Sequence, residues 1–517
     1  MNAALSAAAA GLGPLGLLAV AALSRSFPGA RPRPLERALT LASWAGVLAA
    51  VLGAVALGAQ TAQRQAPLLG GWVRVDALGV GLLLMVSLLV VVIARYSVTY
   101  LDGDPRQGVF LGRLAATAAA VEVLVVADHL LLFWLAWVAT SACLHRLLVF
   151  YPERPRALNA ARKKFVVARL GDLCLGAAFL LLARDAGSAS LSEVLRVAGE
   201  GAPSAGFLLA GLLLALTAAL KSAQFPTHGW LIEVMETPTP VSALLHAGVL
   251  NAGPFLMLRF AAVVQQAPAA TWLLIVVGGF TALFASAALR TQPSVKVALG
   301  YSSAAHMGFM LFVCGLGVFP AAALHLVAHS FYKAHAFLSA GSVVEAAQAA
   351  RVALPPRRWS PLRAAAGLGL ALLAYASVAW ALGLTPWEEP ALLLVGAVLV
   401  LGLTQLLGAG LDRSSSLAAT LRVGLSAWVV AAAFFGLEEL SRRLLAGSLP
   451  PLVTPPSSAL ALGVAVVGAW AAALAVQLLG LGRDTALARH VRVHLRHGLY
   501  ANALFDRLLS PPLRPLN

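Results

Sequence analysis

Long apolar runs separated by short polar loops make up most of the chain. Runs of about 18 or more apolar residues favour membrane-spanning helices, whereas the strands of a membrane barrel alternate over about ten residues. Such runs occupy residues 4–23, 38–59, 77–99, 108–126, 129–150, 165–183, 205–222, 238–263, 270–290, 297–318, 320–345, 363–384, 390–410, 417–437 and 458–481. The pattern predicts an all-α, polytopic membrane helix bundle of about 14–15 transmembrane helices.

The composition agrees with a membrane protein and excludes several other classes. Of 517 residues, 60% are apolar and 11% are charged, whereas a soluble domain carries about 25% charged residues. This excludes an ordinary soluble enzyme, a disordered chain, a coiled coil and a disulfide scaffold. Cys143, Cys174 and Cys314 lie inside apolar runs without CxxC spacing, so we expect no metal or redox cofactor in this chain.

The net charge of +16 comes mainly from short loops, which is typical of membrane topology rather than of nucleic-acid binding. Basic clusters follow the first, fifth and eleventh runs, and the positive-inside rule then predicts an external N-terminus and a cytoplasmic C-terminus. No Lys or Arg precedes the first run, which therefore predicts a span and not a signal peptide. The clusters consist of Arg25, Arg31, Arg33 and Arg37, then Arg154, Arg156, Arg162, Lys163 and Lys164, and then Arg351, Arg357, Arg358 and Arg363.

The tail, residues 483–517, is polar and basic. Its leucines at 495, 499, 504 and 508 recur at roughly helical spacing, which predicts an amphipathic cytoplasmic helix on the membrane or on a partner. The tail histidines, His490, His494 and His497, fit a basic interfacial face better than a metal site.

Lysine is rare, and its positions are informative. Of the 37 basic residues, only Lys163, Lys164, Lys221, Lys296 and Lys333 are lysines. Lysine can lose its proton when it is desolvated, whereas arginine stays charged. The base composition of the gene explains why lysine is scarce. It explains less well why the five lysines lie in or beside the central spans.

Titratable side chains inside the spans form the candidate site. A charge at the centre of a span costs roughly 2.5–3.5 kcal/mol, so such residues usually have a function. They are Glu122, Asp172, Lys221, His246, His306, His325, His329 and Lys333. Because several spans contribute, we favour a relay of titratable groups, with hydrogen bonding between helices as the alternative.

Two local patterns sharpen this prediction. His325, His329 and Lys333 step by four residues, so they form one stripe about 12 Å long. An HxxxH pair can also bind zinc, but the sequence offers no evident third ligand. Prolines and glycines after Lys221 predict a broken helix near residues 223–237; such breaks expose backbone groups that ion transporters use, and a simple proline kink is the alternative.

These segments resemble the antiporter-like subunits, a family that includes the proton-pumping subunits of respiratory complex I and the Mrp-type sodium/proton antiporters. Residues 221–231 (KSAQFPTHGWL) resemble the family pattern KSAQxPxHxWL, and residues 235–247 (METPTPVSALLHA) resemble MExPTPVSALxHA. Residues 296–303 and 329–334 resemble KxxLAYST and HAFFKA. The likeness covers roughly residues 70–350.

The resemblance implies two inverted five-helix repeats with broken helices, and a proton path through Lys221, His246 and Lys333 with Lys163 and Asp172 nearby. The expected domains are 1–107 (N-terminal spans), 108–263 (first repeat), 264–410 (second, degenerate repeat), 411–482 (C-terminal spans) and 483–517 (tail). The candidate ion-translocation residues are Lys221, His246, Lys333, His329, His325, Lys163, Asp172, Glu122, Glu236 and Lys296.

Departures from the complex I pattern indicate one branch of the family. Val138 follows Trp137 where those subunits have a glutamate, for which Glu122 is a candidate substitute, and residues 374–387 contain no lysine. These features, with residues 246–253 and 497–506, resemble the membrane subunits of the DAB inorganic-carbon accumulation complexes.

That resemblance implies a bacterial inner-membrane subunit, in contact with lipid, that couples a proton or sodium gradient to CO2 hydration. The hydration would occur on a soluble, DabA-like zinc-binding partner similar to a β-carbonic anhydrase, with no zinc in this chain. The alternatives are an antiporter-like subunit of complex I, a related hydrogenase or an Mrp complex, and a non-conducting membrane anchor.

Overall fold

The computed structural model describes residues 2–58, 69–343, 361–383, 389–410, 417–478 and 485–509. Within these ranges the regular structure is helical, and the β pairing consists of the isolated bridges Val73–Ala127 and His129–Ser190. The long helices are α1 (Asn2–Leu23), α2 (Arg33–Gly58), α3 (Ala77–Tyr100), α4 (Gln107–Val126), α5 (Leu130–Leu148), α6 (Pro155–Ala186), α8 (Ala205–Lys221), α13 (Pro268–Leu289), α14 (Val295–Gly315), α15 (Phe319–Leu338), α17 (Pro361–Ala381), α18 (Pro390–Gly410), α19 (Leu417–Leu445) and α20 (Ser457–Leu478).

Short helices connect or interrupt these spans. They are η1 (Leu69–Gly71), α7 (Leu191–Glu200), α9 (Gly229–Glu233), η2 (Val234–Glu236), α10 (Thr239–Ala247), η3 (Val249–Asn251), α11 (Ala252–Arg259), α12 (Ala261–Val264), α21 (Ala486–Arg496), η4 (Gly498–Tyr500) and α22 (Ala501–Leu509). The continuous run predicted over 238–263 is therefore a broken span, made of α10, η3, α11 and α12.

By length and composition, the described chain has 12 candidate spans, or up to 13, which is slightly fewer than the predicted 14–15. Twelve segments of the described chain are long and apolar enough to cross a membrane, and α7 with α8 forms a further pair bent by 120°. α1 contributes a shorter apolar stretch, Ala10–Leu23. α15 is not among the twelve, because its histidines and Lys333 dilute an otherwise apolar helix. Each predicted run coincides with helix in the described residues, which confirms the all-helical membrane bundle.

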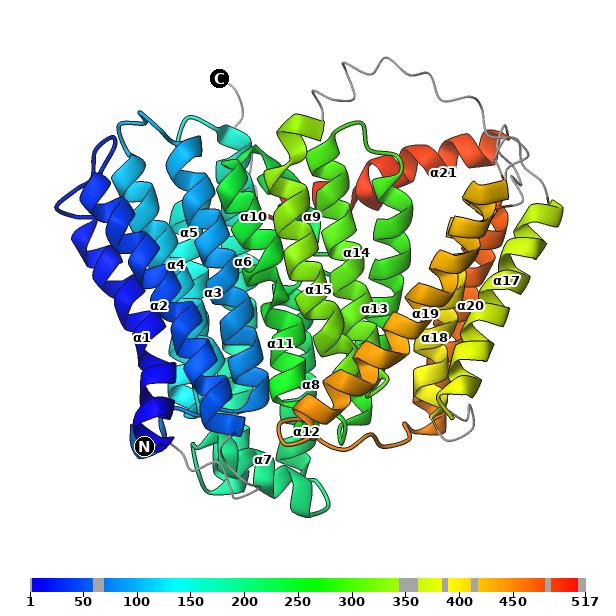
Figure 1. Cartoon of the computed structure of the whole chain (residues 1–517), viewed down its shortest axis with the longest axis horizontal. Helices are drawn as coiled ribbons and strands as arrows, with labels where there is room; N and C mark the ends of the chain where they lie inside the picture. Colours follow the sequence, from blue (N-terminus) through cyan, green and yellow to red (C-terminus); the bar gives the residue numbers. More distant parts are fainter. Residues whose placement is uncertain are drawn as a thin grey trace.

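The helices form one large body with a smaller group beside it. α1 to α6, α8 and α10 to α15 pack together, while α17 and α18 lie along one side (Figure 1). α20 joins this smaller group to the large body, because it packs against α13 and its Trp470 Nε1 donates to the Gly279 carbonyl at 3.1 Å. α19 slants between the two groups, and its Ser441 hydroxyl donates to the Pro320 carbonyl at the start of α15. α17 is continuous over Pro361–Ala381, so the break of the first repeat has no counterpart in that helix. The repeat and domain boundaries stay predictions.

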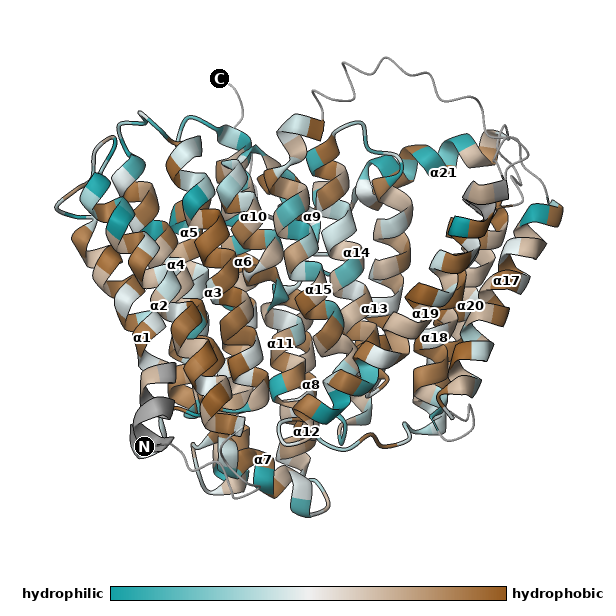
Figure 2. Cartoon of the chain, viewed as in Figure 1, coloured by the Kyte–Doolittle hydropathy of each residue, from teal (hydrophilic) through white to brown (hydrophobic). Residues whose placement is uncertain are grey.

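The two ends of the bundle are polar, and apolar residues cover the spans between them (Figure 2). The α1–α2 and α5–α6 connections lie at the same end as α21, and α1 begins at the opposite end (Figure 1). We call these the α21 end and the α7 end. The first two basic loops thus share a side, as expected. Arg351, Arg357 and Arg358 of the third loop lie outside the described residues, and which side faces the cytoplasm stays a prediction.

The tail differs from the single amphipathic helix that the leucine spacing predicts. α21 lies across the end of the bundle (Figure 1), and the chain then reverses at η4. Gly498, Leu499 and Tyr500 have positive φ values of 61°, 53° and 59°, and left-handed backbone cannot continue a right-handed helix. α22 consequently folds back against α9 instead of extending the leucine face of α21.

Candidate functional site

The helix break after Lys221 is present. α8 ends at Lys221, and helix resumes only at Gly229. In between, Ala223 has a φ of 50° and the Phe225–Pro226 peptide is cis. Side chains partner the freed backbone groups: the Gln224 amide donates to the Ser222 carbonyl at 2.8 Å, and the Phe225 N–H donates to Thr281 Oγ1 at 3.1 Å. The predicted break is therefore confirmed, with a backbone that neighbouring groups stabilise.

A second break lies directly against the first. α10 ends at Ala247, and η3 separates it from α11. The Ala247 carbonyl accepts a hydrogen bond from Asn251 Nδ2 at 2.8 Å, and Ser222 Oγ donates to the Leu250 carbonyl at 3.4 Å. Two interrupted spans thus meet where their backbone polar groups lack partners within the helices and are bonded to side chains instead. Transporters use such pairs of broken helices to bind ions.

Two lysines share a small cavity beside this contact. Its lining includes Lys164, Lys221, Trp230, Leu245 and Leu250. Lys164 Nζ donates to both the carbonyl and the hydroxyl of Ser141, each at 2.8 Å.

Lys221 is held differently from Lys164. Its Nζ has no hydrogen-bond partner among the described residues, and it lies 4.4 Å from the centre of the Trp137 ring. An aromatic face therefore contacts the ammonium, one residue before the position where complex I subunits carry a glutamate.

A second lysine site lies on α15. Lys333 is fully buried and donates to Ser302 Oγ at 2.7 Å and to the Leu299 carbonyl at 3.3 Å. One turn earlier on the same helix, Ser330 accepts a hydrogen bond from Asn251 Nδ2 at 2.7 Å. The broken α10–α11 span thus contacts the lysine regions of both α8 and α15.

His246 also contacts α15. Its ring stacks on Phe337 with centroids 4.3 Å apart, and both ring nitrogens lack a hydrogen-bond partner among the described groups. The His246 ring thus lies against the helix that carries Lys333, and its role in a path between the two lysines stays a prediction.

The histidine stripe of α15 gains a third member from α14. His306 Nδ1 lies 2.9 Å from His325 Nε2, and the ring centroids of His306 and His329 are 5.0 Å apart. The sequence identified His306 as a polar residue in a span, but periodicity within one helix cannot show that a neighbouring helix presents it to this stripe.

Lys163 and Glu236 lie at the α21 end. Lys163 Nζ contacts Glu233 Oε2 at 2.7 Å and Asp506 Oδ1 at 2.5 Å. It also donates to Asn502 Oδ1 at 3.0 Å, so α22 is docked on α6 and α9. Glu236 pairs with the exposed Arg156 at 3.5 Å.

Three further candidates lie outside the lining of the shared cavity, although the Asp172 carboxylate acts electrostatically on both of the cavity lysines. Lys296 donates to Thr239 Oγ1 at 3.1 Å, at the start of α10. Asp172 pairs with Arg169 at 2.6 Å within α6. Glu122 accepts from Ser87 Oγ at 2.9 Å, and its carboxyl is enclosed by α1 to α3. Its described contacts are thus with the N-terminal helices, whereas Trp137 is the residue that contacts Lys221.

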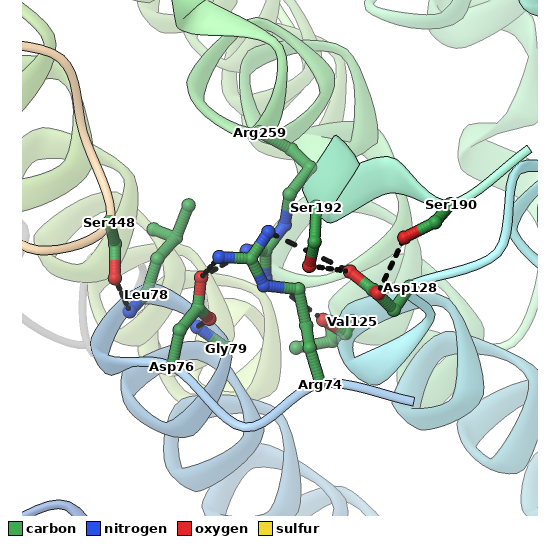
Figure 3. Close-up of polar contacts among 10 residues, drawn as sticks. All are labelled: Arg74, Asp76, Leu78, Gly79, Val125, Asp128, Ser190, Ser192, Arg259 and Ser448. Carbon is green, nitrogen blue, oxygen red and sulfur yellow. Dashed lines mark hydrogen bonds and ion pairs between the residues drawn. The ribbon is translucent and has the colours of Figure 1, made fainter. Parts of the chain in front are cut away.

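A buried charge cluster at the α7 end escaped the sequence analysis (Figure 3). Asp76 caps α3 by accepting from the Gly79 N–H at 2.7 Å. It also pairs with Arg259 at 2.5 Å and with Arg74 at 3.1 Å. Burial raises the pKa of Asp76, but Arg259 and Arg74 outweigh it and bring the pKa to about 2. The cluster joins the end of α11 to the start of α3, and so anchors the broken span at its far end.

Comparison with known proteins identifies the family. Residues 127–358 match the model of the transmembrane family described as NADH:quinone oxidoreductase/Mrp antiporter. The chain is 38% identical over 459 residues to the "Probable inorganic carbon transporter subunit DabB2" of Halothiobacillus neapolitanus, covering 87% of this chain and 82% of the relative. This chain belongs to the DabB family of antiporter-like membrane subunits.

Other similarities give the range of the family. A DabB relative from Hydrogenovibrio crunogenus is 44% identical over 285 residues, a match that spans 55% of each chain. NADH-quinone oxidoreductase subunit L of Mycobacterium tuberculosis is 34% identical over 405 residues, which is 75% of this chain and 61% of the relative.

Two solved structures share the fold. The Mrp complex from Dietzia sp. matches with a TM-score of 0.61 and 24% identity, over 98% of this chain and 60% of the matched chain. The archaeal membrane-bound sulfane sulfur reductase matches with a TM-score of 0.55 and 16% identity, over 98% and 99%. At these identities the likeness concerns the fold alone.

Proposed function

We propose that this chain is the ion-translocating membrane subunit of a two-component inorganic-carbon accumulation complex. It couples a proton or sodium gradient across the bacterial inner membrane to CO2 hydration by a cytoplasmic, DabA-like zinc partner. The observation that carries the ion-translocating part is the contact between the two broken spans, flanked by Lys221 on one side and Lys333 on the other. The names of the DabB relatives support inorganic carbon as the transported class.

Lys221 and Lys333 are the groups that load and release the ion, here written as a proton. Each lies where a fixed charge is expensive. Lys333 has hydroxyl and carbonyl partners, and the carboxylate that acts on Lys221 is Asp172, which is itself paired with Arg169. The hydroxyl groups of Ser222 and Ser330 and the amide group of Asn251 lie between the Lys221 and Lys333 regions. Water between these groups would complete a hydrogen-bonded path.

The hydration chemistry belongs to the partner in this proposal. A metal-activated water is what CO2 hydration requires, and the partner's zinc supplies it. The membrane subunit then acts as a transporter component and not as an enzyme. Growth rescue at ambient CO2 should therefore require both proteins, and rescue by this chain alone would sink the assignment.

A second candidate function is that of a proton-pumping subunit in a complex I-type or Mrp-type assembly. The 34% identity to NADH-quinone oxidoreductase subunit L favours it. Affinity purification with mass spectrometry of the bound proteins separates the two candidates. Co-purification of quinone-oxidoreductase or antiporter subunits would support the second, and co-purification of a large zinc protein would support the first.

The decisive experiment replaces Lys221 and Lys333 by Arg and by Ala. Arginine keeps the charge but cannot release a proton, so each Arg variant should fail nearly as badly as the Ala variant. The measurement is gradient-dependent bicarbonate accumulation in cells that also express the partner, with complex assembly checked by pulldown. Arg162→Lys, on the exposed face of α6, is the control. Near-normal transport by both Arg variants would rule out the relay.

A further inference from the structure

His306, His325 and His329 form a compact cluster of imidazoles between α14 and α15. One nitrogen from each ring lies within 4.8 Å of the corresponding nitrogens of the other two. Three histidines on two packed helices form the ligand set of a metal site that keeps one position open. The sequence-based expectation of no metal rested on the dispersed cysteines and on the lack of a third ligand beside the HxxxH pair, and α14 supplies a third ligand.

The hydrogen-bonding state of His329 is an independent observation. Its side chain is buried, with 3% of its surface exposed, and neither ring nitrogen has a hydrogen-bond partner among the described residues. A buried polar group without a hydrogen-bond partner destabilises the folded state. A ligand that accepts the lone pair of one imidazole nitrogen would remove part of this cost.

We propose that His306, His325 and His329 bind a divalent transition-metal ion of the Zn²⁺ class. Neutral imidazole suits Zn²⁺, Cu²⁺ and Ni²⁺. Zn–N bonds of about 2.0–2.1 Å place tetrahedral ligand atoms about 3.4 Å apart. The His306–His325 contact of 2.9 Å opens slightly to meet this spacing, and His329 moves closer by side-chain rotation. One ring of the His306–His325 pair changes tautomer, so that both facing nitrogens present lone pairs.

Metal binding has a consequence that rests on the proposed function. The imidazole lone pairs that hold the metal are the ones that would carry protons along the α15 stripe. Lys333 lies one turn beyond His329, so an ion at the cluster separates this lysine from His325. Zn²⁺ is therefore expected to inhibit transport, whereas binding itself is independent of transport.

The test is a Co²⁺ titration of the full-length chain, purified without its partner and freed of metal. Tetrahedral Co²⁺ with nitrogen ligands gives visible absorption bands, and added Zn²⁺ should displace them. Loss of an outer-shell partner already weakens metal sites by about 10–100-fold. His306→Gln, His325→Gln and His329→Gln should therefore each weaken Co²⁺ binding by at least about 100-fold.

Two controls identify the source of any signal. His335→Gln changes an exposed histidine of α15 outside the cluster and should bind Co²⁺ as the unaltered chain does. A triple Ala variant of the tail histidines His490, His494 and His497 should do the same. If binding is absent in the unaltered chain, survives all three cluster substitutions, or disappears with the tail variant, the proposal is overturned. Each variant is first checked by size-exclusion chromatography, and one well-folded cluster variant is enough to decide.

Discussion

The ammonium of Lys221 rests against the face of Trp137, 4.4 Å from the ring centre, with no hydrogen-bond acceptor among the described residues. A cation over an aromatic face gains about 0.5–1 kcal/mol at an exposed site and about 2 kcal/mol or more when it is desolvated. Unlike a carboxylate, the ring does not hold the proton as a fixed ion pair. The contact therefore stabilises the protonated form of Lys221 and still allows the side chain to release its proton.

Trp137→Leu should abolish most gradient-dependent transport while the complex still assembles. Leucine fills part of the volume but has no ring face, so a protonated Lys221 loses its attractive contact. Trp137→Phe keeps a ring and should retain more transport than the leucine variant. Bicarbonate accumulation, normalised to the assembled complex, distinguishes them. Equal transport by the two variants would show that the ring face is irrelevant.

Asp506→Asn should loosen the tail. Lys163 is buried beneath α22 and contacts both Glu233 and Asp506, so the substitution removes one of its two counter-charges. The ion pair is partly exposed, and its loss should cost about 1 kcal/mol or less. We expect faster trypsin cleavage at the arginines of α21. Arg507→Gln, at the next residue on an exposed face, is the control, and cleavage that is unchanged in Asp506→Asn would contradict the docking.

Asp76→Asn should strongly destabilise the bundle at neutral pH. The side chains of Asp76 and Arg259 are 0% and 1% exposed, and removing one partner of a buried pair costs about 3–5 kcal/mol. Asp102→Asn, which breaks the exposed Arg31–Asp102 pair, should have little effect. Thermal unfolding in detergent measures the difference.

The same pair gives a pH dependence with a defined sign. The pKa of Asp76 lies at about 2 in the folded state, below its ordinary value of about 3.9. A lowered carboxyl pKa stabilises the folded state fully above about pH 4, and this contribution is lost as the pH falls towards 2. The unfolding temperature difference between the unaltered chain and Asp76→Asn should therefore shrink only below about pH 4. A difference that already shrinks between pH 7 and pH 5 would contradict this account.

Gly13→Ala and Gly46→Ala should both destabilise the N-terminal helices. An added Cβ would collide with Glu122 Oε2 at Gly13 and would lie 2.8 Å from Ser87 Oγ at Gly46. Overpacking of this kind costs about 1–3 kcal/mol. Gly81→Ala on α3, where nothing lies within 4 Å, should be neutral or slightly stabilising. If all three variants unfold at the same temperature, the enclosure of Glu122 is not tight.

The sequence predicted the features that depend on neighbours along the chain. Apolar runs located the spans, and Pro226 with Gly229 located the break after α8, because these signals are local. Even α15, which falls short on hydropathy, was predicted from its apolar residues between polar ones. The backbone reversal at Leu499 was missed, since a non-glycine residue with positive φ leaves no clear signal in leucine spacing.

The contacts that the sequence did not predict depend on how each helix is rotated and on which helices pack beside it. Lys163 and Lys164 are adjacent, yet about 100° of helical rotation sends one to the tail and the other to the shared cavity. Asp76 and Arg259 are 183 residues apart in the chain, so no local pattern could pair them. His306 meets the α15 stripe only because α14 packs beside it.

The docking of α22 also fixes an order of events during synthesis. Lys163 reaches the membrane early, but Asn502, one of its partners, follows 339 residues later. Until then the α6–α9 surface has no cover from α22. A chain that stops before α22 therefore keeps Glu233 but lacks Asn502 and Asp506 as partners of Lys163. Its α6–α9 surface stays uncovered, and surfaces of this kind are what cellular quality control acts on.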